Sequence, residues 1–220
     1  SLTGSLIPTT DLGNGAGQVV VRPQVTSSYQ LFANGAQGSS VTDFVTLTVE
    51  AAPLRISEMM LDPNGNNNQT QWVEIHNDGE YFVDLGRYYI GAGTSDYTAT
   101  AANLQGIIPP QGCVVIGGPT SNGANGQPSY DQVLDFVPNL PSSVTSDGGV
   151  ALFFEQSPAP TDIPVDSVVF GTANSGGLLD EGGSPDGELS PATTEGDSLE
   201  RISATSDVMA VQSSPSPGRC

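Results

Sequence analysis

The sequence is divided into short runs of β-branched and aromatic residues, each bounded by glycine, proline, asparagine or aspartate. The clearest runs span residues 83–90, 114–116, 150–154 and 165–170. They have the length of β-strands and recur at intervals typical of a β-sandwich. The 27 Gly and 17 Pro residues make up about a fifth of the 220 positions, which favours tight turns over helices. The sequence therefore predicts an all-β protein that is long enough to bury a core.

The charge balance is strongly acidic. The chain has 24 Asp and Glu residues, five Arg and no Lys, which gives a formal net charge of −19. Such a surface repels phosphate backbones and anionic lipids, so we expect no binding to nucleic acid or to a membrane surface. No apolar run reaches the roughly 18 residues of a membrane-spanning helix, which predicts no membrane insertion. The carboxylates either keep the surface solvated or cluster to bind Ca²⁺, a cation that prefers oxygen ligands.

Cys113 and Cys220 are the only cysteines. An even pair in an acidic, strand-rich chain predicts a disulfide, and with it an oxidising, extracellular location. The alternative is two free thiols, one in a buried strand and one at a frayed end. The sequence begins at Ser1 without an initiator Met or a leader, so we expect a processed chain or a part of a longer one.

Residues 1–50 form the predicted first domain, and residues 51–53 the linker that follows it. Apolar and polar residues alternate at 28–33 and at 41–49, with the turn-forming pairs Asn34-Gly35 and Gln37-Gly38 between them. A strand is also predicted at 19–22, and a weaker one near Leu6-Ile7. The closing half of bacterial immunoglobulin-like surface repeats resembles this pattern through Pro23, Thr26, Ser27, Ser28, Tyr29, Leu31, Gly38-Ser39 and residues 45–49.

The resemblance implies an incomplete first sandwich. A complete one has about seven strands in roughly 100 residues, and residues 1–50 hold about half of that number. Either the missing strands precede this sequence in a longer protein, which is the simpler explanation, or another chain adds them to the open edge of the sheet.

Residues 54–220 contain a series of short motifs. The series comprises Ile56-Ser57-Glu58, residues 72–77, Val83-Asp84-Leu85-Gly86, residues 108–116, 147–153 and 165–171, Ser198-Leu199-Glu200-Arg201 and Ser216-Pro217-Gly218. In order and spacing the series resembles the bacterial lamin-tail domain over essentially the whole segment. Tyr88-Tyr89 departs from it, since the family often has Trp there, and Cys113 stands at a commonly aromatic position. The resemblance implies an immunoglobulin-like β-sandwich that serves as a binding or scaffolding module.

These features predict a non-enzymatic, extracellular structural or interaction module at a bacterial cell surface. Its partners would be proteins, through self-association or contact with other surface proteins. Strand complementation of the half-sandwich would make the chain a subunit of a surface filament or layer. One alternative is the non-catalytic accessory module of a larger secreted enzyme. Another is a calcium-dependent adhesin module that binds glycans or proteins through its polar loops.

Glu58 and Glu74 lie in strand-like segments joined by one connection, so we expect them to face each other across an antiparallel pair. Two carboxylates so placed repel each other unless a cation lies between them. Arg201 is the candidate, because its planar guanidinium binds carboxylates bidentately and the chain has few other cations. We therefore predict a structural ion cluster of these three residues. The alternatives are a Ca²⁺ site and a catalytic acid–base pair, which the single Trp of the chain disfavours for a glycosidase.

Two polar loops, 62–70 and 180–188, are rich in the side-chain oxygens that Ca²⁺ prefers. The first lacks the alternating carboxylates and closing Glu of an EF-hand, and its alternative is a mobile, solvated turn. The second is interpreted in the same way, with disorder as its alternative. Asn68-Gln69-Thr70 is also an N-glycosylation sequon, which has meaning only in a cell that glycosylates secreted chains. The candidate calcium ligands are Asp62, Asn64, Asn66, Asp180, Glu181 and Asp186.

No motif predicts catalysis. His76 is the only histidine, and a single imidazole forms no zinc site without thiolates or suitably placed carboxylates, so we expect a structural role for it. The nucleophile elbow Gly-x-Ser-x-Gly fails at its last position in residues 182–186, and no phosphate-binding glycine loop follows a strand into a helix. We predict no enzymatic activity, and calcium is the one candidate cofactor.

Overall fold

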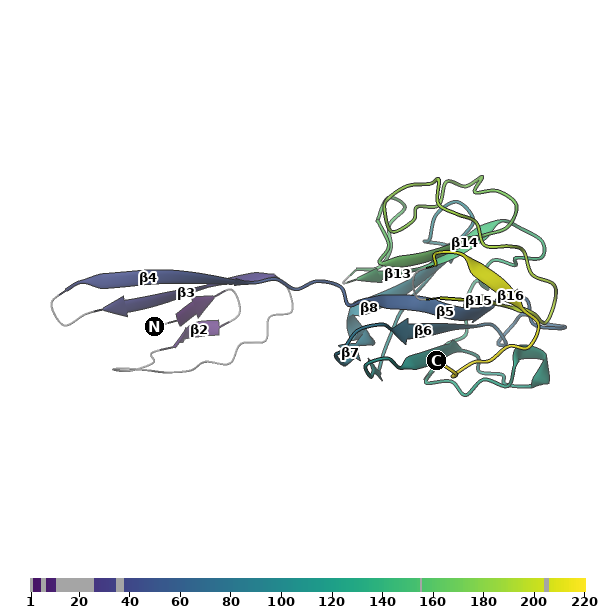
Figure 1. The fold of residues 1–220 in the computed structure, drawn as a ribbon, viewed down its shortest axis with the longest axis horizontal. Helices are drawn as coiled ribbons and strands as arrows, with labels where there is room; N and C mark the ends of the chain where they lie inside the picture. The colour runs from purple at the N-terminus through teal and green to yellow at the C-terminus, as the bar shows by residue number, and fades with distance from the viewer. Residues whose placement is uncertain (1, 5–6, 11–25, 35–37, 155, 204–205) are drawn as a thin grey trace. The chain divides into compact units, whose positions relative to one another are not determined.

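The computed structural model describes residues 2–4, 7–10, 26–34, 38–154, 156–203 and 206–220 (Figure 1). The chain divides into two compact units, Ser1–Ala51 and Ala52–Cys220, called unit 1 and unit 2 below. The described residues are all-β, as predicted, and their helical segments are two short 3₁₀ turns, η1 (Leu85–Arg87) and η2 (Gly123–Asn125). No helix among the described residues is long and apolar enough to cross a membrane.

Unit 1 contains one antiparallel sheet in the order β2-β1-β3-β4. Its two long strands coincide closely with the alternating runs of the sequence. The predicted strand at 19–22 lies outside the described residues. The strands are β1 (Leu2–Gly4), β2 (Ile7–Thr10), β3 (Ser27–Asn34) and β4 (Ser40–Leu47).

Unit 2 contains two larger sheets and one short pair of strands. The six-stranded sheet has the order β12 (Gln132–Val133), β11 (Cys113–Gly117), β6 (Trp72–Asn77), β5 (Leu54–Met60), β15 (Ser198–Arg201) and β16 (Met209–Gln212). The four-stranded sheet has the order β14 (Asp166–Phe170), β13 (Gly148–Phe154), β8 (Tyr88–Gly93) and β9 (Thr100–Asn103). A separate pair joins β7 (Val83–Asp84) to β10 (Ile107–Ile108).

The predicted run 83–90 is not one strand. The Asp84 carboxylate accepts a hydrogen bond of 2.9 Å from the N–H of Gly86 and starts the turn η1. This short-range bond competes with strand pairing, as aspartate side chains often do. The run is therefore split into β7, which pairs with β10, and β8, which joins the four-stranded sheet.

The main core lies between the two large sheets of unit 2. Along β6, Val73 and Ile75 point into this core, and the alternation of a strand turns Glu74 and His76 to the opposite, outer face. The four-stranded sheet contributes Val150 and other apolar residues to the same core. Each large, fully buried side chain stabilises the fold by about 1.5–3 kcal/mol.

The outer face of the six-stranded sheet has an apolar part and a polar part. Met60, Trp72 and Val115 form the apolar part, and the Trp72 indole donates a hydrogen bond of 2.7 Å to the carbonyl of Asn125 in the loop that covers it. The polar part lies under the last residues of the sequence. Here Cys113 of β11 and Cys220 form the predicted disulfide, with their Cα atoms 5.9 Å apart.

Candidate functional site

The last eight residues, 213–220, cross the polar outer face of the six-stranded sheet, and we call them the strap. Three of the strap's residues bind three neighbouring strands in turn. The N–H of Ser216 donates to Glu58 of β5 (3.0 Å to Oε1), and the N–H of Gly218 donates to Glu74 of β6 (2.6 Å to Oε2). Cys220 then bonds to β11. Alternate strap residues thus hold β5, β6 and β11.

A β-bulge between Ile56 and Glu58 sets the two glutamates side by side. Glu58 and Glu74 are direct partners across the antiparallel pair β5–β6. Glu58 is 2% exposed and also accepts a hydrogen bond of 2.6 Å from the Ser198 hydroxyl. Glu74 accepts one of 2.6 Å from the Ser57 hydroxyl. Two close carboxylates are therefore accommodated by N–H and O–H donors.

The pKa of Glu58 lies above its usual value, chiefly because burial disfavours the charged form. The hydrogen bonds from Ser198 and Ser216 lower this pKa in part, and the nearby charges of Glu74 and Glu200 raise it further. The Ser216 N–H of the strap thus offsets part of the effect of burial on this pKa.

Arg201 does not join the two glutamates, which corrects the predicted ion cluster. Its guanidinium forms an ion pair with Asp166 of β14, 3.0 Å from Nη2 to Oδ2, and both side chains are 3% exposed. The reason is strand alternation. Glu200 pairs with Glu58 in the β15–β5 ladder, so the next residue, Arg201, points the other way, toward the four-stranded sheet.

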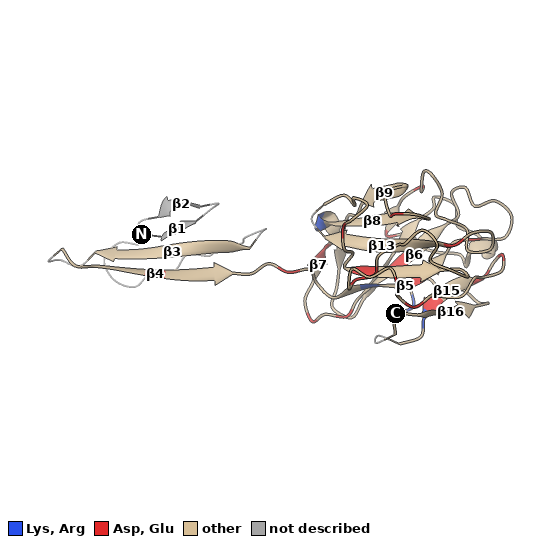
Figure 2. Cartoon of the chain, turned by 90° about the horizontal axis from the view of Figure 1, so that it is seen from above, with Lys and Arg blue, Asp and Glu red and all other residues tan. Residues whose placement is uncertain are grey.

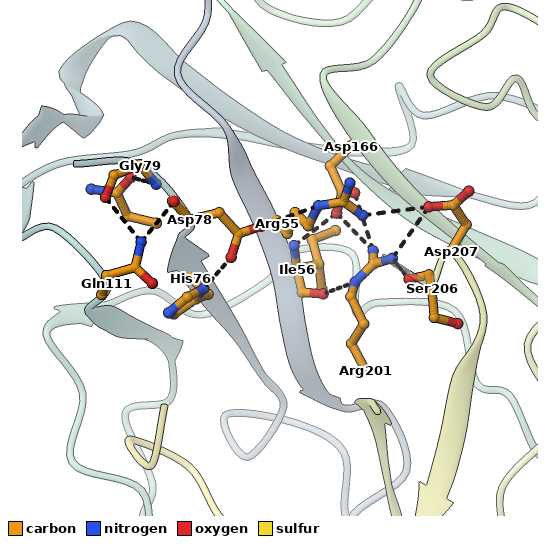
Figure 3. Close-up of polar contacts among 11 residues, drawn as sticks. Arg55, Ile56, His76, Asp78, Gly79, Gln111, Asp166, Arg201, Ser206 and Asp207 are labelled. Carbon is orange, nitrogen blue, oxygen red and sulfur yellow. Dashed lines mark hydrogen bonds and ion pairs between the residues drawn. The ribbon is translucent and has the colours of Figure 1, made fainter. Parts of the chain in front are cut away.

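The Arg201–Asp166 pair replaces backbone pairing at the bulge. β15 pairs with β5 only at Met59 and Glu58, which leaves Ile56 without a backbone partner on that side. Asp166 Oδ2 accepts the Ile56 N–H at 2.7 Å, and Arg201 Nε donates to the Ile56 carbonyl at 3.0 Å (Figure 3). The buried ion pair therefore satisfies both polar groups of Ile56 and ties the two sheets together.

The charged network extends to the surface through Arg55. Arg55 Nε lies 3.2 Å from Asp78 Oδ2, and its Nη1 lies 3.4 Å from Asp207 (Figure 3). The other oxygen of Asp78 contacts His76 Nδ1 at 2.7 Å. Asp207 also lies 3.8 Å from Arg201, which links the exposed pairs to the buried one.

Burial raises the pKa of Asp166 to about 6 from its ordinary 3.8, even though Arg201 and the Ile56 N–H favour the charged form. Between pH 4 and 6 the folded chain then binds more protons than the unfolded chain at this position. The contribution of Asp166 to the free energy of unfolding therefore falls as the pH rises through this window.

We expect the free energy of unfolding to rise by about 2 kcal/mol when the pH is lowered from 7 to 4.5, as urea unfolding at each pH measures. In the variant Asp166→Asn, the part of this pH dependence that comes from Asp166 should be missing. A wild-type stability that increases with pH over this range, or an equal slope in the variant, would contradict the assignment to Asp166.

A cavity of about 210 Å³ lies beside the strap. Three of the five arginines of the chain line it, in a molecule whose net charge is −19. Figure 2 shows acidic residues on the same strands, β5, β6 and β15. The ionisable residues that line the cavity are Arg55, Arg201, Arg219, Glu58, Glu74, Asp78, Glu200 and His76.

The candidate calcium ligands of the first loop form hydrogen bonds or packing contacts with other residues of the chain. Asp62 is 3% exposed, and its Oδ2 accepts hydrogen bonds from the N–H and hydroxyl of Ser143 at 2.7 and 2.9 Å. Asn66 Oδ1 accepts the N–H of Asn68 at 3.0 Å, and Asn64 lies against Gly196. Asn68, the sequon residue, is exposed, and its side chain accepts a hydrogen bond of 3.0 Å from Asn139.

The second loop is likewise organised by its own hydrogen bonds. Asp180 Oδ1 accepts the N–H groups of Gly182 and Ser184 at 2.9 and 2.7 Å, and Glu181 accepts the Ser167 hydroxyl at 3.0 Å. Asp180 and Glu181 line a common cavity of about 250 Å³, and Asp186 is not part of its lining. Among the described residues, no three His, Cys, Asp or Glu side chains are placed to hold a metal ion. Calcium binding stays a prediction.

Asp166 and the strap were not predicted, and the sequence contains a signal only for Asp166. Asp166 interrupts the apolar run 165–170, and a lone carboxylate in such a run indicates a buried partner. Residues 208–220 contain no Asp or Glu, but the longer stretches 12–42 and 97–130 contain none either, so this composition does not single out the strap.

No protein-family model matches this chain, and no curated protein matches it. Among solved structures, the chain is similar to a DUF4876 family protein from Bacteroides thetaiotaomicron VPI-5482, with 12% sequence identity and a TM-score of 0.39. That match covers 83% of this chain and 75% of the other. A likeness at this distance carries no argument about function.

Proposed function

We propose that this chain is a non-enzymatic structural or interaction module of an extracellular or cell-surface protein. In this proposal unit 2 is a lamin-tail-like, immunoglobulin-like sandwich. Unit 1 is a partial immunoglobulin-like sheet that associates with a second copy of the chain. The disulfide and the acidic surface support the location, because disulfides persist in oxidising compartments.

The observation that carries the proposal is an exposed apolar face in unit 1. Ala33 pairs with Val41 and Tyr29 with Val45, so odd-numbered residues of β3 and β4 share one face of the sheet. On this face Leu31 is 43% exposed, Val41 68% and Val45 51%, whereas Tyr29 is buried and Asp43 lies between the two valines. A sheet normally buries such a face against a second layer.

The edge of the same sheet favours strand addition. Among the described strands β4 is the outermost in the order β2-β1-β3-β4, and an unprotected edge presents N–H and C=O groups to another strand. Charge also favours this unit as the contact. Residues 1–51 hold three of the 24 acidic residues and one of the five arginines, a formal charge of −2 out of −19. Two copies can therefore approach through unit 1 with little repulsion.

The buried charges of unit 2 support a structural role rather than a catalytic one. Asp166 and Arg201 are engaged with each other and with the Ile56 backbone, and Glu58 holds the strap. Every fully buried side-chain nitrogen and oxygen among the described residues has a hydrogen-bond partner.

Self-association is tested with the full chain by sedimentation velocity between about 1 and 200 μM. We expect dimers and larger species in the wild type, and monomers in Val41→Glu/Val45→Glu, because two carboxylates on the apolar face prevent its burial. The matched control is Thr42→Glu/Thr46→Glu, which adds the same charge to the opposite face of β4, where Phe44 is 67% exposed, and should still associate if the odd-numbered face makes the contact. A wild-type chain that stays monomeric at every concentration would contradict the proposal, and would favour strands supplied by a preceding segment of the same protein.

A further inference from the structure

Three Asn-Gly pairs lie among the described residues of the chain, and the same reaction is open to each by composition. They are Asn64-Gly65, Asn122-Gly123 and Asn125-Gly126, while the pairs at 14–15 and 34–35 include residues outside the described ones. In an Asn-Gly pair the backbone nitrogen of the glycine can attack the side-chain amide of the asparagine, because glycine has no Cβ to hinder the approach. Hydrogen bonds that hold the amide or the attacking N–H oppose this reaction, so the fold decides which pair reacts.

The two pairs at the turn η2 are held by hydrogen bonds. Asn122 Oδ1 accepts the N–H of Ala124 at 2.9 Å and starts the turn. Asn125 is 0% exposed, and its Nδ2 donates to the carbonyls of Thr70 and Thr120 at 3.0 and 2.7 Å. Reaction at either asparagine would break these bonds, so the folded chain protects both.

The pair Asn64-Gly65 is exposed and lacks such bonds. Among the described residues, neither the Asn64 side chain nor the Gly65 N–H has a hydrogen-bond partner. Gly65 has a φ of +99°, and nothing lies within 4 Å of the position that a Cβ would take. The carbonyls of Asp62 and Asn66 on either side accept hydrogen bonds of 2.7 and 2.6 Å from other residues. The pair is therefore the unbraced tip of a loop that is anchored on both sides.

We propose that Asn64 is a site of spontaneous deamidation, which converts it to aspartate or isoaspartate and adds one negative charge to the loop 62–70. The Gly65 nitrogen forms a bond to Asn64 Cγ, the Cγ–Nδ2 bond breaks, and Nδ2 leaves as ammonia with the proton of the Gly65 nitrogen. Water then opens the succinimide ring at the side-chain carbonyl to give aspartate, or at the backbone carbonyl to give isoaspartate. The site belongs to unit 2 and self-association concerns unit 1, so each proposal can fail without the other.

The new charge lies against an acidic turn. Asn64 Nδ2 contacts Gly196 so closely that an added Cβ would have no room there. Gly196 stands between Glu195 and Asp197, and its N–H donates to the carbonyl of Asp62 at 2.7 Å. A carboxylate at position 64 would be repelled by this turn. Deamidation therefore weakens the hydrogen bond that joins the turn to the loop.

The reaction is tested on the folded full chain, incubated for several weeks at about 37 °C and mildly alkaline pH. Fragment spectra of proteolytic peptides assign each mass increase of about 1 Da to a residue. We expect Asn64 to react at least about tenfold faster than Asn122 or Asn125. The matched control is the same chain reduced and unfolded in urea, where all three asparagines should react within about threefold of one another. A folded chain in which Asn64 reacts no faster than the other two would overturn the proposal.

The effect of the charge is tested with two variants of the same residue. Asn64→Asp introduces the carboxylate directly, and Asn64→Ser is the neutral control. We expect the amide of Gly196 to exchange several-fold faster in Asn64→Asp than in Asn64→Ser, with a smaller difference in about 1 M salt, which screens exposed charges. Equal exchange in the two variants would overturn the effect on the turn even if Asn64 deamidates.

Discussion

Replacing Arg201 with methionine should lower the free energy of unfolding of unit 2 by about 3–5 kcal/mol, the cost of leaving a buried charge without its partner. Asp166 would keep its burial and lose its ion pair, and the carbonyl of Ile56 would lose the donor that lies 3.0 Å away. Urea unfolding followed by the fluorescence of Trp72, the single tryptophan, measures the change.

Arg55→Met is the matched control, because it removes the same charge from the same network. The Arg55 side chain is 30% exposed and pairs with Asp78 at the surface, so we expect a loss of about 0–1 kcal/mol. Replacing both members of the buried pair, as Arg201→Met/Asp166→Leu, should recover part of the Arg201→Met loss. Equal losses of unfolding free energy in Arg201→Met and Arg55→Met would contradict the prediction that burial of the Arg201–Asp166 pair sets the size of the loss.

Removing the disulfide should lower the free energy of unfolding by a similar amount. Cys113 and Cys220 are 107 residues apart in sequence, and closing a loop of that length restricts the unfolded chain by about 4–5 kcal/mol in the chain-entropy model. We expect Cys113→Ala/Cys220→Ala to lower the melting temperature by about 10–20 °C in differential scanning calorimetry. The strap would then be held to β5 and β6 by hydrogen bonds alone.

A reducing agent provides the control for the disulfide prediction. Dithiothreitol should lower the melting temperature of the wild type to that of the double alanine variant, and should leave the variant unchanged. A loss of less than about 1 kcal/mol on reduction would mean that the strap stays in place without its covalent anchor, and would contradict a stabilising role for the disulfide.

The strands of unit 2 could be predicted well where β-branched and aromatic residues form an uninterrupted run. The runs 150–154 and 165–170 correspond to Gly148–Phe154 and Asp166–Phe170. The run 83–90 failed because a local hydrogen bond from Asp84 outweighs strand propensity over a few residues. Strand propensity depends on packing partners, and these are far away in the sequence.

The candidate site could be predicted only in part. The pairing of Glu58 with Glu74 follows from one connection between adjacent strands, and the disulfide follows from there being two cysteines. The partner of Arg201 depends on which face of β15 it occupies and on how β14 packs across the core. The sequence pattern sets neither, because a shift of one residue in register reverses every side chain.

The measurement that tests the central proposal most directly is amide hydrogen exchange of the full chain at about 2 and 200 μM. Association through unit 1 predicts that the amides of β4, Ser40–Leu47, exchange several-fold more slowly at the higher concentration, while those of β13 and β14 do not change. Identical exchange of β4 at the two concentrations would contradict association through this sheet.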